Sequence, residues 1–568
     1  MNRPSINVNG LRVAIEGEKN LLEVIHKAGI DLPTFCYHSD ISVYGACRMC
    51  IVEVEGRGLV PACSEPAVNG MVVRTNTKQL RSMRKMIIEL MLASHDQSCL
   101  TCPKSNDCHL QSIANQLGVK KVRFKHIESS EKIDLTSAGI AHNPKMCILC
   151  GDCVRVCSEI QSVGALDFAY RGADARIVKG FDQSLGDSEC VNCGQCVKVC
   201  PVGALMIKTN ITALLDEVCD PDKFVVAQIA PAVRVALGEY FGEKPGVLNM
   251  GKIASAMRII GFDRVYDMCF GADFTVVEEG KEFLERYQKG QNLPIFTSCC
   301  PAWVKFAEQY YPELLGNLST AKSPMQMFGV IGKDRLSEEL NIPREKIVMV
   351  AVTPCTAKKY EIAREEFRTD GNPDVDYSIT TEELAQIMKG QGINFDKLDS
   401  GGLDMPFSFA SGGAVIFGSS GGVSEAVLRY AADVLEKDSA RTFKEVRASK
   451  GVKIGEIAIG GSTLRLGVVS GLANAKELIE KIQRGEEHFD IVEVMACIGG
   501  CVSGGGQPIH HGAETSAERS QGLFDDDNTR QVRASSQNPF LQKLYNEHMD
   551  EEKAHTMLHT HFTSRKRF

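Results

Sequence analysis

The chain has 568 residues, of which 43% are hydrophobic and 24% charged, and its formal net charge is −8. This globular composition predicts several domains, and the negative charge leaves no electrostatic footprint for nucleic acid. No apolar run reaches the roughly 18 residues of a membrane span and no secretory segment is visible, so we expect a cytoplasmic protein that does not bind membranes. Its 22 cysteines would be reduced there, and their Cys-x2-Cys spacings favour metal ligation over disulfides.

Residues 1–80 predict a small sheet with one helix. Alternating apolar residues on either side of Asn9-Gly10 predict a β-hairpin, and Asn20 can cap a helix that ends at Gly29. Four thiolates complete two tetrahedral irons bridged by sulfides, so the cysteines of the next loop predict a [2Fe-2S] ferredoxin-like domain, with structural zinc as the alternative. These cysteines, in C-x10-C-x2-C-x12-C order, are Cys36, Cys47, Cys50 and Cys63.

Residues 81–126 begin with a helical stretch and continue with an H-x3-C-x2-C-x5-C motif. Alone, the histidine would be interpreted as a surface residue, but its position four residues before Cys-x2-Cys predicts a ligand of a [4Fe-4S] cluster. One imidazole in place of a thiolate removes a negative charge and should raise the reduction potential, as in Rieske centres. The predicted ligands are His95, Cys99, Cys102 and Cys108.

Residues 127–209 contain an internal repeat. Both copies have the C-x2-C-x2-C-x3-C spacing of bacterial two-cluster ferredoxins, in which the fourth cysteine of each copy ligates the cluster of the other copy. One [4Fe-4S] cluster is therefore predicted on Cys147, Cys150, Cys153 and Cys200. The other is predicted on Cys157, Cys190, Cys193 and Cys196. Pro201 follows the second copy as the pattern expects, whereas Ser158 takes that place in the first copy.

Residues 210–510 change to apolar runs that alternate with helical stretches, which predicts α/β layers with buried strands. The runs are FVVAQIA, LPIFTSCC, IVMVAVTPC, AVIFG, LRLGVVSG and FDIVEVMAC. Three of them end in cysteine, at the carboxyl ends of strands where open α/β sheets bind ligands. Cys501 lies just beyond the last run, before three glycines. Four thiols from three strand ends can therefore converge on one more cubane.

Three motifs carry a family resemblance: TSCCPAW (297–303), TPCTAKKYE (353–361) and EVMACIGGCVSGGGQP (493–508). They resemble the signature motifs of [FeFe]-hydrogenases, and the whole chain resembles the large clostridial type. The resemblance implies a multidomain α/β and α+β fold, with a β-grasp [2Fe-2S] domain, a one-His/three-Cys cluster domain, a two-[4Fe-4S] ferredoxin-like domain and a two-lobed α/β catalytic domain. Residues 511–568 resemble the segment that is a separate small subunit in some relatives.

The resemblance also implies a cofactor, the H-cluster, which is a [4Fe-4S] cubane bridged to a diiron unit bearing CO, cyanide and azadithiolate. Its cubane would be held by Cys300, Cys355, Cys497 and Cys501, the last of which bridges to the diiron unit. Lys358 would donate to one cyanide. The backbone at Pro231-Ala232 would lie near the other cyanide, and Met495 would pack beside the diiron unit.

A proton route is implied as well. It would begin at Cys299, the motif cysteine without a cubane role, because a thiol with a reference pKa near 8.5 can exchange protons. The family's route continues, in this sequence, through Glu279, Ser319, Glu282 and Arg286. Without the family, two glutamates three residues apart on a helix would be interpreted as a solvated face.

Some positions depart from the family or have no assigned task. Thr353 replaces a common Met, Ala232 a Ser and Met325 a Gln, and such changes around a metal site tune its potential and protonation. Cys219 and Cys269 are interpreted as structural thiols. The glycine-rich stretch 417–426 has no nucleotide-binding order, which favours a strand-to-helix turn near the active site.

The sequence thus predicts an iron-only hydrogenase of the ferredoxin hydrogenase class that catalyses H2 = 2 H+ + 2 e− reversibly. Four accessory iron-sulfur clusters would exchange electrons with ferredoxin or flavodoxin. Maturation proteins would build the diiron unit, and the protein is expected to be a monomer. The alternatives are a hydrogen sensor, a respiratory dehydrogenase subunit and an iron-sulfur assembly protein. The sensor is disfavoured by the retained Cys299, and the other two by the complete set of C-terminal motifs.

Overall fold

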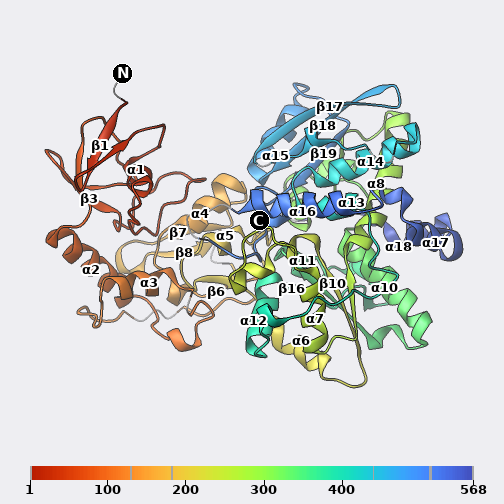
Figure 1. The fold of residues 1–568 in the computed structure, drawn as a ribbon, viewed down its shortest axis with the longest axis horizontal. Helices are drawn as coiled ribbons and strands as arrows, with labels where there is room; N and C mark the ends of the chain where they lie inside the picture. Colours follow the sequence, from red (N-terminus) through yellow and green to blue (C-terminus); the bar gives the residue numbers. More distant parts are fainter. Residues whose placement is uncertain are drawn as a thin grey trace. The chain divides into compact units, whose positions relative to one another are not determined.

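The computed structural model describes residues 3–105, 107–127, 131–180, 183–438, 441–448, 450–510 and 515–565. The chain forms two compact units, and Figure 1 labels their elements. The N-terminal unit comprises Met1–Glu159, Gly164–Ser188 and Val199–Met206. The C-terminal unit comprises Ile160–Val163, Glu189–Lys198 and Ile207–Phe568. None of the helices in the described ranges is long and apolar enough to cross a membrane.

The N-terminal unit begins with a five-stranded sheet in the order β2-β1-β5-β3-β4. The predicted hairpin is confirmed, since Val8 pairs with Leu11 and both Asn9 and Gly10 have positive φ. The predicted cap is also confirmed, because the side chain of Asn20 accepts a hydrogen bond from the Glu23 amide. The elements are β1 (Ser5–Val8), β2 (Leu11–Ala14), α1 (Leu21–Lys27), β3 (Ile51–Val54), β4 (Gly58–Pro61) and β5 (Val72–Arg74).

Short elements between cysteine-bearing loops make up the rest of this unit. The helical stretch predicted at the start of residues 81–126 is confirmed as α2 (Lys78–Ala93), which begins a few residues earlier because the Thr77 side chain caps it. Two two-stranded ladders follow, β6 with β9 and β7 with β8. The elements are α3 (His109–Gln116), β6 (Ile140–His142), α4 (Asp152–Arg155), β7 (Leu166–Ala169), β8 (Arg176–Lys179), α5 (Gln195–Val199) and β9 (Leu205–Ile207), although most of α5 belongs to the C-terminal unit.

The C-terminal unit contains two four-stranded sheets. The first has the order β11-β10-β13-β16 and is wholly parallel, and every residue of β13 is buried, as expected when helices cover both faces. Its strands are β10 (Phe224–Ile229), β11 (Arg264–Asp267), β13 (Ile347–Thr353) and β16 (Tyr377–Thr380). The helices next to them in sequence are α6 (Ile211–Val218), α7 (Met250–Ile260), α10 (Pro324–Leu340), α11 (Ala357–Glu361) and α12 (Thr381–Gly390).

The second sheet has the order β12-β19-β18-β17, with only the β17–β18 pair antiparallel. Its strands are β12 (Ile295–Phe296), β17 (Val452–Ile459), β18 (Ser462–Ser470) and β19 (Ile491–Met495). The remaining helices of the unit are α8 (Cys269–Lys289), α9 (Pro301–Tyr310), α13 (Gly412–Val415), α14 (Gly422–Glu436), α15 (Leu472–Gln483), α16 (Ser516–Thr529), α17 (Pro539–His548) and α18 (Glu551–Leu558). A small ladder pairs β14 (Arg368–Thr369) with β15 (Asn372–Pro373).

One strand prediction is wrong. The run AVIFG forms the end of α13 and the 3-10 turn Ile416–Gly418 instead of a strand. A short apolar run without alternation fits a buried helix as well as a buried strand, and Ser411 caps this one by accepting a hydrogen bond from the Ala414 amide. The expected strand-to-helix turn in the glycine-rich stretch is therefore a turn between two helical segments.

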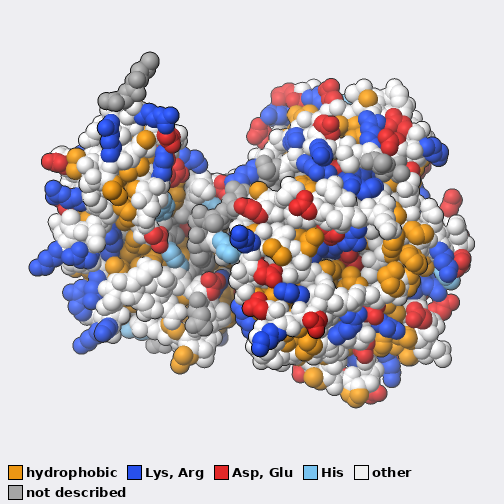
Figure 2. Space-filling view, viewed as in Figure 1, with side chains coloured by type: hydrophobic (Ala, Val, Ile, Leu, Met, Phe, Trp, Pro, Cys, Tyr) orange, Lys and Arg blue, Asp and Glu red, His pale blue; other side chains and the backbone are white. Residues whose placement is uncertain are grey.

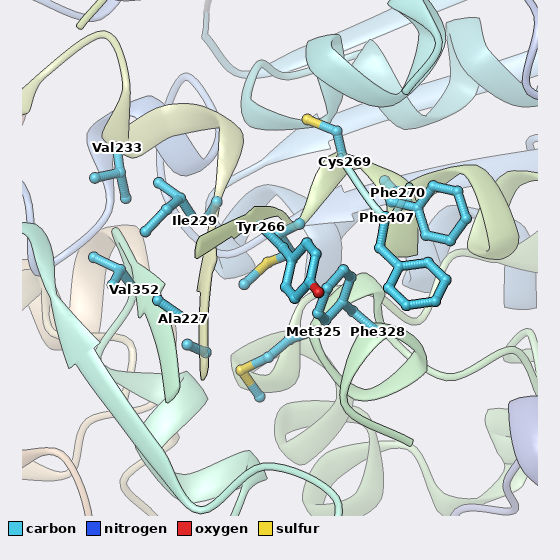
Figure 3. Packing of buried hydrophobic residues seen from close by; sticks show 14 of the residues in the cluster. Ala227, Ile229, Val233, Tyr266, Cys269, Phe270, Met325, Phe328, Val352 and Phe407 are labelled. Atoms are coloured by element: carbon cyan, nitrogen blue, oxygen red, sulfur yellow. The ribbon is translucent and has the colours of Figure 1, made fainter. Parts of the chain in front are cut away.

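The largest core lies in the C-terminal unit between the first sheet and α8, α10 and α13 (Figure 3). The ring of Tyr266 lies 5.7 Å from those of both Phe328 and Phe407. Cys269, which follows β11 at the start of α8, is fully buried, and its Sγ lies 3.0 Å from a guanidinium nitrogen of Arg234. Cys219 ends α6 and is exposed.

A buried ion-pair network attaches α16 to α14. Arg429 in α14 is fully buried and donates two hydrogen bonds of 2.8 and 2.9 Å to Asp527 in α16. Its other partner is Glu425, at 2.6 Å, and Arg533 also donates to Asp527. Because neither charge of the pair reaches water, removing one leaves the other uncompensated.

We predict that Asp527→Ala lowers the thermal unfolding temperature strongly. The loss should be about 3–5 kcal/mol, the typical cost of breaking a buried ion pair from one side. Asp525→Ala is the matched control, since Asp525 is exposed on the same helix and should change stability little. Equal unfolding temperatures for the two variants in differential scanning calorimetry would contradict the role assigned to the network.

Candidate active site

A cavity with about 830 Å³ of empty volume lies within the C-terminal unit, at the carboxyl ends of strands from both sheets. Cys300 follows β12, Cys355 follows β13, and Cys497 and Cys501 follow β19; all four line the cavity. The structure thus brings together the four cysteines that the sequence placed at strand ends. Within the described residues no three His, Cys, Asp or Glu side chains converge on a point for one metal ion, so the thiols surround a space instead.

Close backbone packing closes one side of this cavity. A Cβ at Gly504 would lie 2.2 Å from the Pro354 carbonyl oxygen, and one at Gly500 would lie 2.6 Å from the Ser420 amide nitrogen. Only glycine fits at these two positions, which explains the glycines around Cys501. Phe417 and Gly418, at the start of the glycine-rich stretch, also line the cavity, as expected for a turn near the site.

Most other lining side chains are small or apolar, so a cofactor bound there would be held largely by packing. The residues that the sequence assigned to the diiron unit all line the cavity, and so do the three departures; together they are Pro231, Ala232, Met325, Thr353, Lys358 and Met495. The Thr353 hydroxyl lies 3.3 Å from the Cys355 carbonyl oxygen and 3.3 Å from Ser378 Oγ. It therefore adds polarity next to one of the clustered thiols.

Lys358 brings a positive charge to the cavity wall. Its ammonium lies 2.6 Å from Glu361 and donates a 3.3 Å hydrogen bond to the Cys299 carbonyl. Burial alone would lower its pKa, but Glu361 outweighs burial and the net shift is upward. The ammonium is thus charged at neutral pH and can donate to an anionic ligand in the cavity.

The residues of the expected proton route lie in order from the cavity wall outward. Cys299 lines the cavity, and Glu279 of α8 is close enough for its charge to raise the pKa of that thiol, after burial. Ser319 Oγ donates to Glu282 at 2.8 Å, and Arg286 donates to Glu282 at 2.6 Å. Arg286 is partly exposed, so the last of these residues reaches the surface.

The solvated-face interpretation of Glu279 is wrong, because its side chain is only 1% exposed. Neither carboxyl oxygen has a hydrogen-bond partner among the described residues. Burial and then the charge of Glu282 raise its pKa to about 8. A carboxyl group with such a pKa can both take up and release a proton near neutral pH.

Two contacts at the site could not be predicted from the sequence. The Gln195 side chain donates to Cys497 Sγ at 3.1 Å, and Cys193 lines the cavity. Both residues belong to the second copy of the cysteine repeat, some 300 positions away in the chain from Cys497. The repeat spacing locates Cys193 as a ligand, but nothing local indicates that its loop reaches this cavity.

In the N-terminal unit, the four cysteines of the first module are buried and close together. The thiol of Cys36 contacts those of Cys47 and Cys63, and Cys50 contacts Cys63. Backbone amides also approach these sulfurs, with the Cys47 amide 3.4 Å from Cys36 Sγ. Converging buried thiols with amide donors fit an iron-sulfur cluster.

His95 has the environment expected of a metal ligand. It is buried, burial lowers its pKa, and it makes a backbone hydrogen bond with Met146. Its Nδ1 is buried without a partner in the described structure. A neutral imidazole with one nitrogen held by a carbonyl and the other free is the usual arrangement at a metal.

The structure brings together only one of the two ligand sets that the cysteine repeat predicts. A cavity with about 360 Å³ of empty volume in the N-terminal unit is lined by the predicted cross-repeat set, Cys147, Cys150, Cys153 and Cys200. Of the other set, Cys157 belongs to the N-terminal unit, whereas Cys190, Cys193 and Cys196 belong to the C-terminal unit. That second ligand set stays a prediction.

The chain resembles known proteins over its full length. Family models match residues 223–505 (iron only hydrogenase large subunit, C-terminal domain) and 513–565 (iron hydrogenase small subunit). Three others match residues 3–78 (2Fe-2S iron-sulfur cluster binding domain), 84–123 (NADH-ubiquinone oxidoreductase-G iron-sulfur binding region) and 146–204 (4Fe-4S dicluster domain). Iron hydrogenase 1 of Clostridium pasteurianum is 35% identical, over 98% of this chain and 99% of that one. The chain belongs to the iron-only, or [FeFe], hydrogenases.

Two further relatives extend this result. The NADP-reducing hydrogenase subunit HndD of Solidesulfovibrio fructosivorans is 42% identical over the full length of both chains. A solved structure of apo [FeFe]-hydrogenase HydA1 from Chlamydomonas reinhardtii matches with a TM-score of 0.57 and 37% identity, over 63% of this chain and 99% of that one. The protein is therefore a hydrogenase with an H-cluster catalytic domain and accessory 2Fe-2S and 4Fe-4S domains.

The pKa of Glu279 predicts a pH dependence of stability. The folded hydrogenase keeps this proton up to a pKa of about 8, whereas an ordinary glutamate carboxyl has a pKa of 4.5. Between these values the folded state binds one more proton than the unfolded state, so the free energy of unfolding falls by about 1.4 kcal/mol per pH unit. Glu279→Gln should remove that contribution to the slope in denaturant melts.

Glu285→Gln is the matched control, because Glu285 is exposed on the same helix and should leave the slope unchanged. If Glu279→Gln and the native protein lose stability equally between about pH 5 and about pH 7.5, Glu279 is not the buried acid described above.

Proposed function

We propose that this [FeFe]-hydrogenase catalyses H2 = 2 H+ + 2 e− at the cavity of the C-terminal unit and exchanges the electrons with a partner through four accessory clusters. The observation that carries the proposal is the convergence of Cys300, Cys355, Cys497 and Cys501 on one cavity, close to the buried carboxyl group of Glu279. When bound, the H-cluster supplies the iron centre at which H2 is split or formed.

Residues of the chain would hold this cofactor and carry the proton that the reaction takes up or releases. The four cysteines are proposed as cubane ligands, because soft thiolates suit iron-sulfur chemistry. Lys358 would donate to one cyanide, the backbone at Pro231-Ala232 would face the other, and Met495 would pack beside the diiron unit. These positions are supported by their place on the cavity wall.

Proton movement would follow the route from the cavity to the surface. Cys299 would exchange the proton at the diiron unit and pass it to Glu279, whose raised pKa supports both uptake and release. Ser319 would hand it to Glu282, which its hydroxyl already contacts, and Arg286 would hold Glu282 at the exit. Ser319 also acts on the pKa of Glu279, so these two side chains are close together.

The electron route rests on the accessory domains. We infer one [2Fe-2S] cluster in residues 1–80, one His95-ligated [4Fe-4S] cluster in 81–126 and two [4Fe-4S] clusters in 127–209. The catalytic domain would then span 210–510 and the small-subunit-like segment 511–568. The donation from Gln195 to Cys497 supports a direct electronic approach between the second repeat and the cubane.

The electron partner is proposed from charge. Lys and Arg side chains gather on the part of the N-terminal unit that carries α2 (Figure 2). We count with this basic face the segment after α3, which lies against α2 where Lys85 donates to the Gly118 carbonyl. Its exposed members are Arg74, Lys78, Arg81, Lys120, Lys121, Arg123 and Lys125. A positive face next to the cluster loops suits an acidic carrier such as ferredoxin or flavodoxin, because complementary charge speeds association.

A second candidate is favoured by the name of one relative. The similarity to an NADP-reducing hydrogenase subunit supports a role as the hydrogenase subunit of an assembly that reduces NADP. The sequence has no nicotinamide or flavin fingerprint of its own, so another subunit would react with the nucleotide. Purification of the native protein decides between a monomer served by a soluble carrier and a hydrogenase bound to flavin-containing subunits.

We predict that Lys78→Glu with Lys121→Glu slows ferredoxin-coupled turnover by about tenfold at low salt, since steering by complementary charge is lost. Exchange between H2 and D2O should be unchanged, because it needs no external carrier. Lys476→Glu, at an exposed position of the C-terminal unit, is the charge-matched control. Unchanged ferredoxin coupling in the double variant would rule out docking on the basic face.

Thr353 stands where the family commonly has Met, and we predict that it alters the bias between H2 oxidation and H2 evolution. Thr353→Met removes the hydroxyl that bonds beside Cys355 and restores the family's common residue, so the ratio of oxidation to evolution currents should change by about tenfold. Protein-film electrochemistry measures this ratio directly. Thr556→Met, at an exposed position, is the control; an identical ratio in native protein and Thr353→Met would contradict the proposed influence.

A further inference from the structure

Glu282, the outermost carboxylate of the proposed proton route, has a third neighbour besides Ser319 and Arg286. The amide of Thr320 lies 3.0 Å from one carboxylate oxygen, and its hydroxyl lies 3.1 Å from the other. The same hydroxyl lies 2.7 Å from Nδ1 of His559. Thr320 therefore links Glu282 to an imidazole that is not part of the route described so far.

His559 is held between two proton-exchanging partners. Its Nε2 lies 3.0 Å from Glu278 Oε2, so both ring nitrogens are engaged. Backbone hydrogen bonds fix the segment, with Lys322 donating to the Leu558 carbonyl and Thr560 donating to that of Thr320, both at 2.8 Å. A histidine that bridges a hydroxyl and a carboxylate can accept a proton on one nitrogen and release one from the other.

From His559 the contacts continue to the surface. Its ring stacks at 4.8 Å on that of His555, which is exposed. Glu278 is bonded by Tyr545 and, at 2.8 Å, by Lys281, and both line a surface cavity between α8, α14, α17 and α18. The chain of contacts from Glu282 thus ends at solvent through the small-subunit-like segment.

We propose that Thr320, His559 and Glu278 form a second proton exit, which leaves the proposed route at Glu282 and opens into the cavity beside Tyr545. The proposal rests on the proposed function, because it shares Glu282 with the first exit. The small-subunit-like segment would then take part in proton transfer as well as in packing.

The proton balance of one passage is simple. Glu282 gives a proton to the Thr320 hydroxyl, which gives its own proton to Nδ1 of His559. Nε2 then releases a proton to Glu278, which passes it to water in the cavity. The ring is then protonated on Nδ1 instead of Nε2, and the starting tautomer returns when Nδ1 gives one proton to water and Nε2 takes one from water. One proton has moved outward without any change in the number that Thr320, His559 and Glu278 hold.

The charges around His559 suit this task. The groups that face it are Glu278 and His555, with Glu282 behind Thr320. Burial would raise the pKa of Glu278, but hydrogen bonds from His559 and Lys281 hold it at about 2. Glu278 is therefore ionised and can accept the proton that Nε2 of His559 releases.

The test uses His559→Gln, alone and combined with Arg286→Leu, in the loaded enzyme. If the two exits run in parallel, His559→Gln should slow H2 oxidation modestly alone but by about tenfold or more with Arg286→Leu, and imidazole should restore turnover. His561→Gln, at a nearby exposed histidine, is the matched control. Equal relative losses in both backgrounds, with no rescue by imidazole, would overturn the proposal.

A second readout does not depend on turnover. Infrared pH titration, with Glu278→Gln to assign the band, should show protonated Glu278 at higher pH in His559→Gln than in the native protein, because a supporting hydrogen bond is lost. No change in that band would also overturn the proposal. Glu282→Gln distinguishes a failure of the proposed function from a failure of this proposal. Undiminished turnover in Glu282→Gln would contradict the shared proton route. Lost turnover in Glu282→Gln, with His559 variants that behave like the native protein, would contradict only the second exit.

Discussion

The constraint on which this structure depends is the burial of four thiols around one cavity. Cys300, Cys355, Cys497 and Cys501 come from the ends of strands in two different sheets, so the cavity exists only when both sheets and their connections are in place. Burial protects a reactive centre from water, but it also means that electrons and protons must be carried by the protein. The residues proposed to carry protons and electrons would meet that requirement.

Proton transfer and electron transfer would use different parts of the C-terminal unit. In the proposed function, protons would move along α8 and the strand-end loops, where carboxyl, hydroxyl and imidazole groups follow one another within hydrogen-bond reach. Electrons would pass through the second cysteine repeat, whose Cys193 lines the cavity and whose Gln195 donates to Cys497. This division lets each path be tuned without the other, because proton relays need titratable groups and electron relays need soft sulfur ligands.

Much of this site could be predicted from the sequence because cluster binding depends on local spacing. The strand ends before Cys355 and Cys497 and the cap at Asn20 are local signals, and all appear in the structure. The signal failed where tertiary packing decides: AVIFG became helical, and Glu279 is buried although glutamates are usually solvated. The approach of His559 to Thr320, 239 positions apart, has no local signature.

The most direct test of the account is H2 evolution from reduced methyl viologen by the purified protein after the diiron cofactor has been supplied. Viologen delivers electrons without a specific docking face, so the assay isolates the cavity and its proton route. The account predicts sustained H2 production that disappears when Cys300→Ser removes a proposed cubane ligand. A fully loaded protein that makes no H2, or a Cys300→Ser variant that makes as much as the native protein, would contradict it.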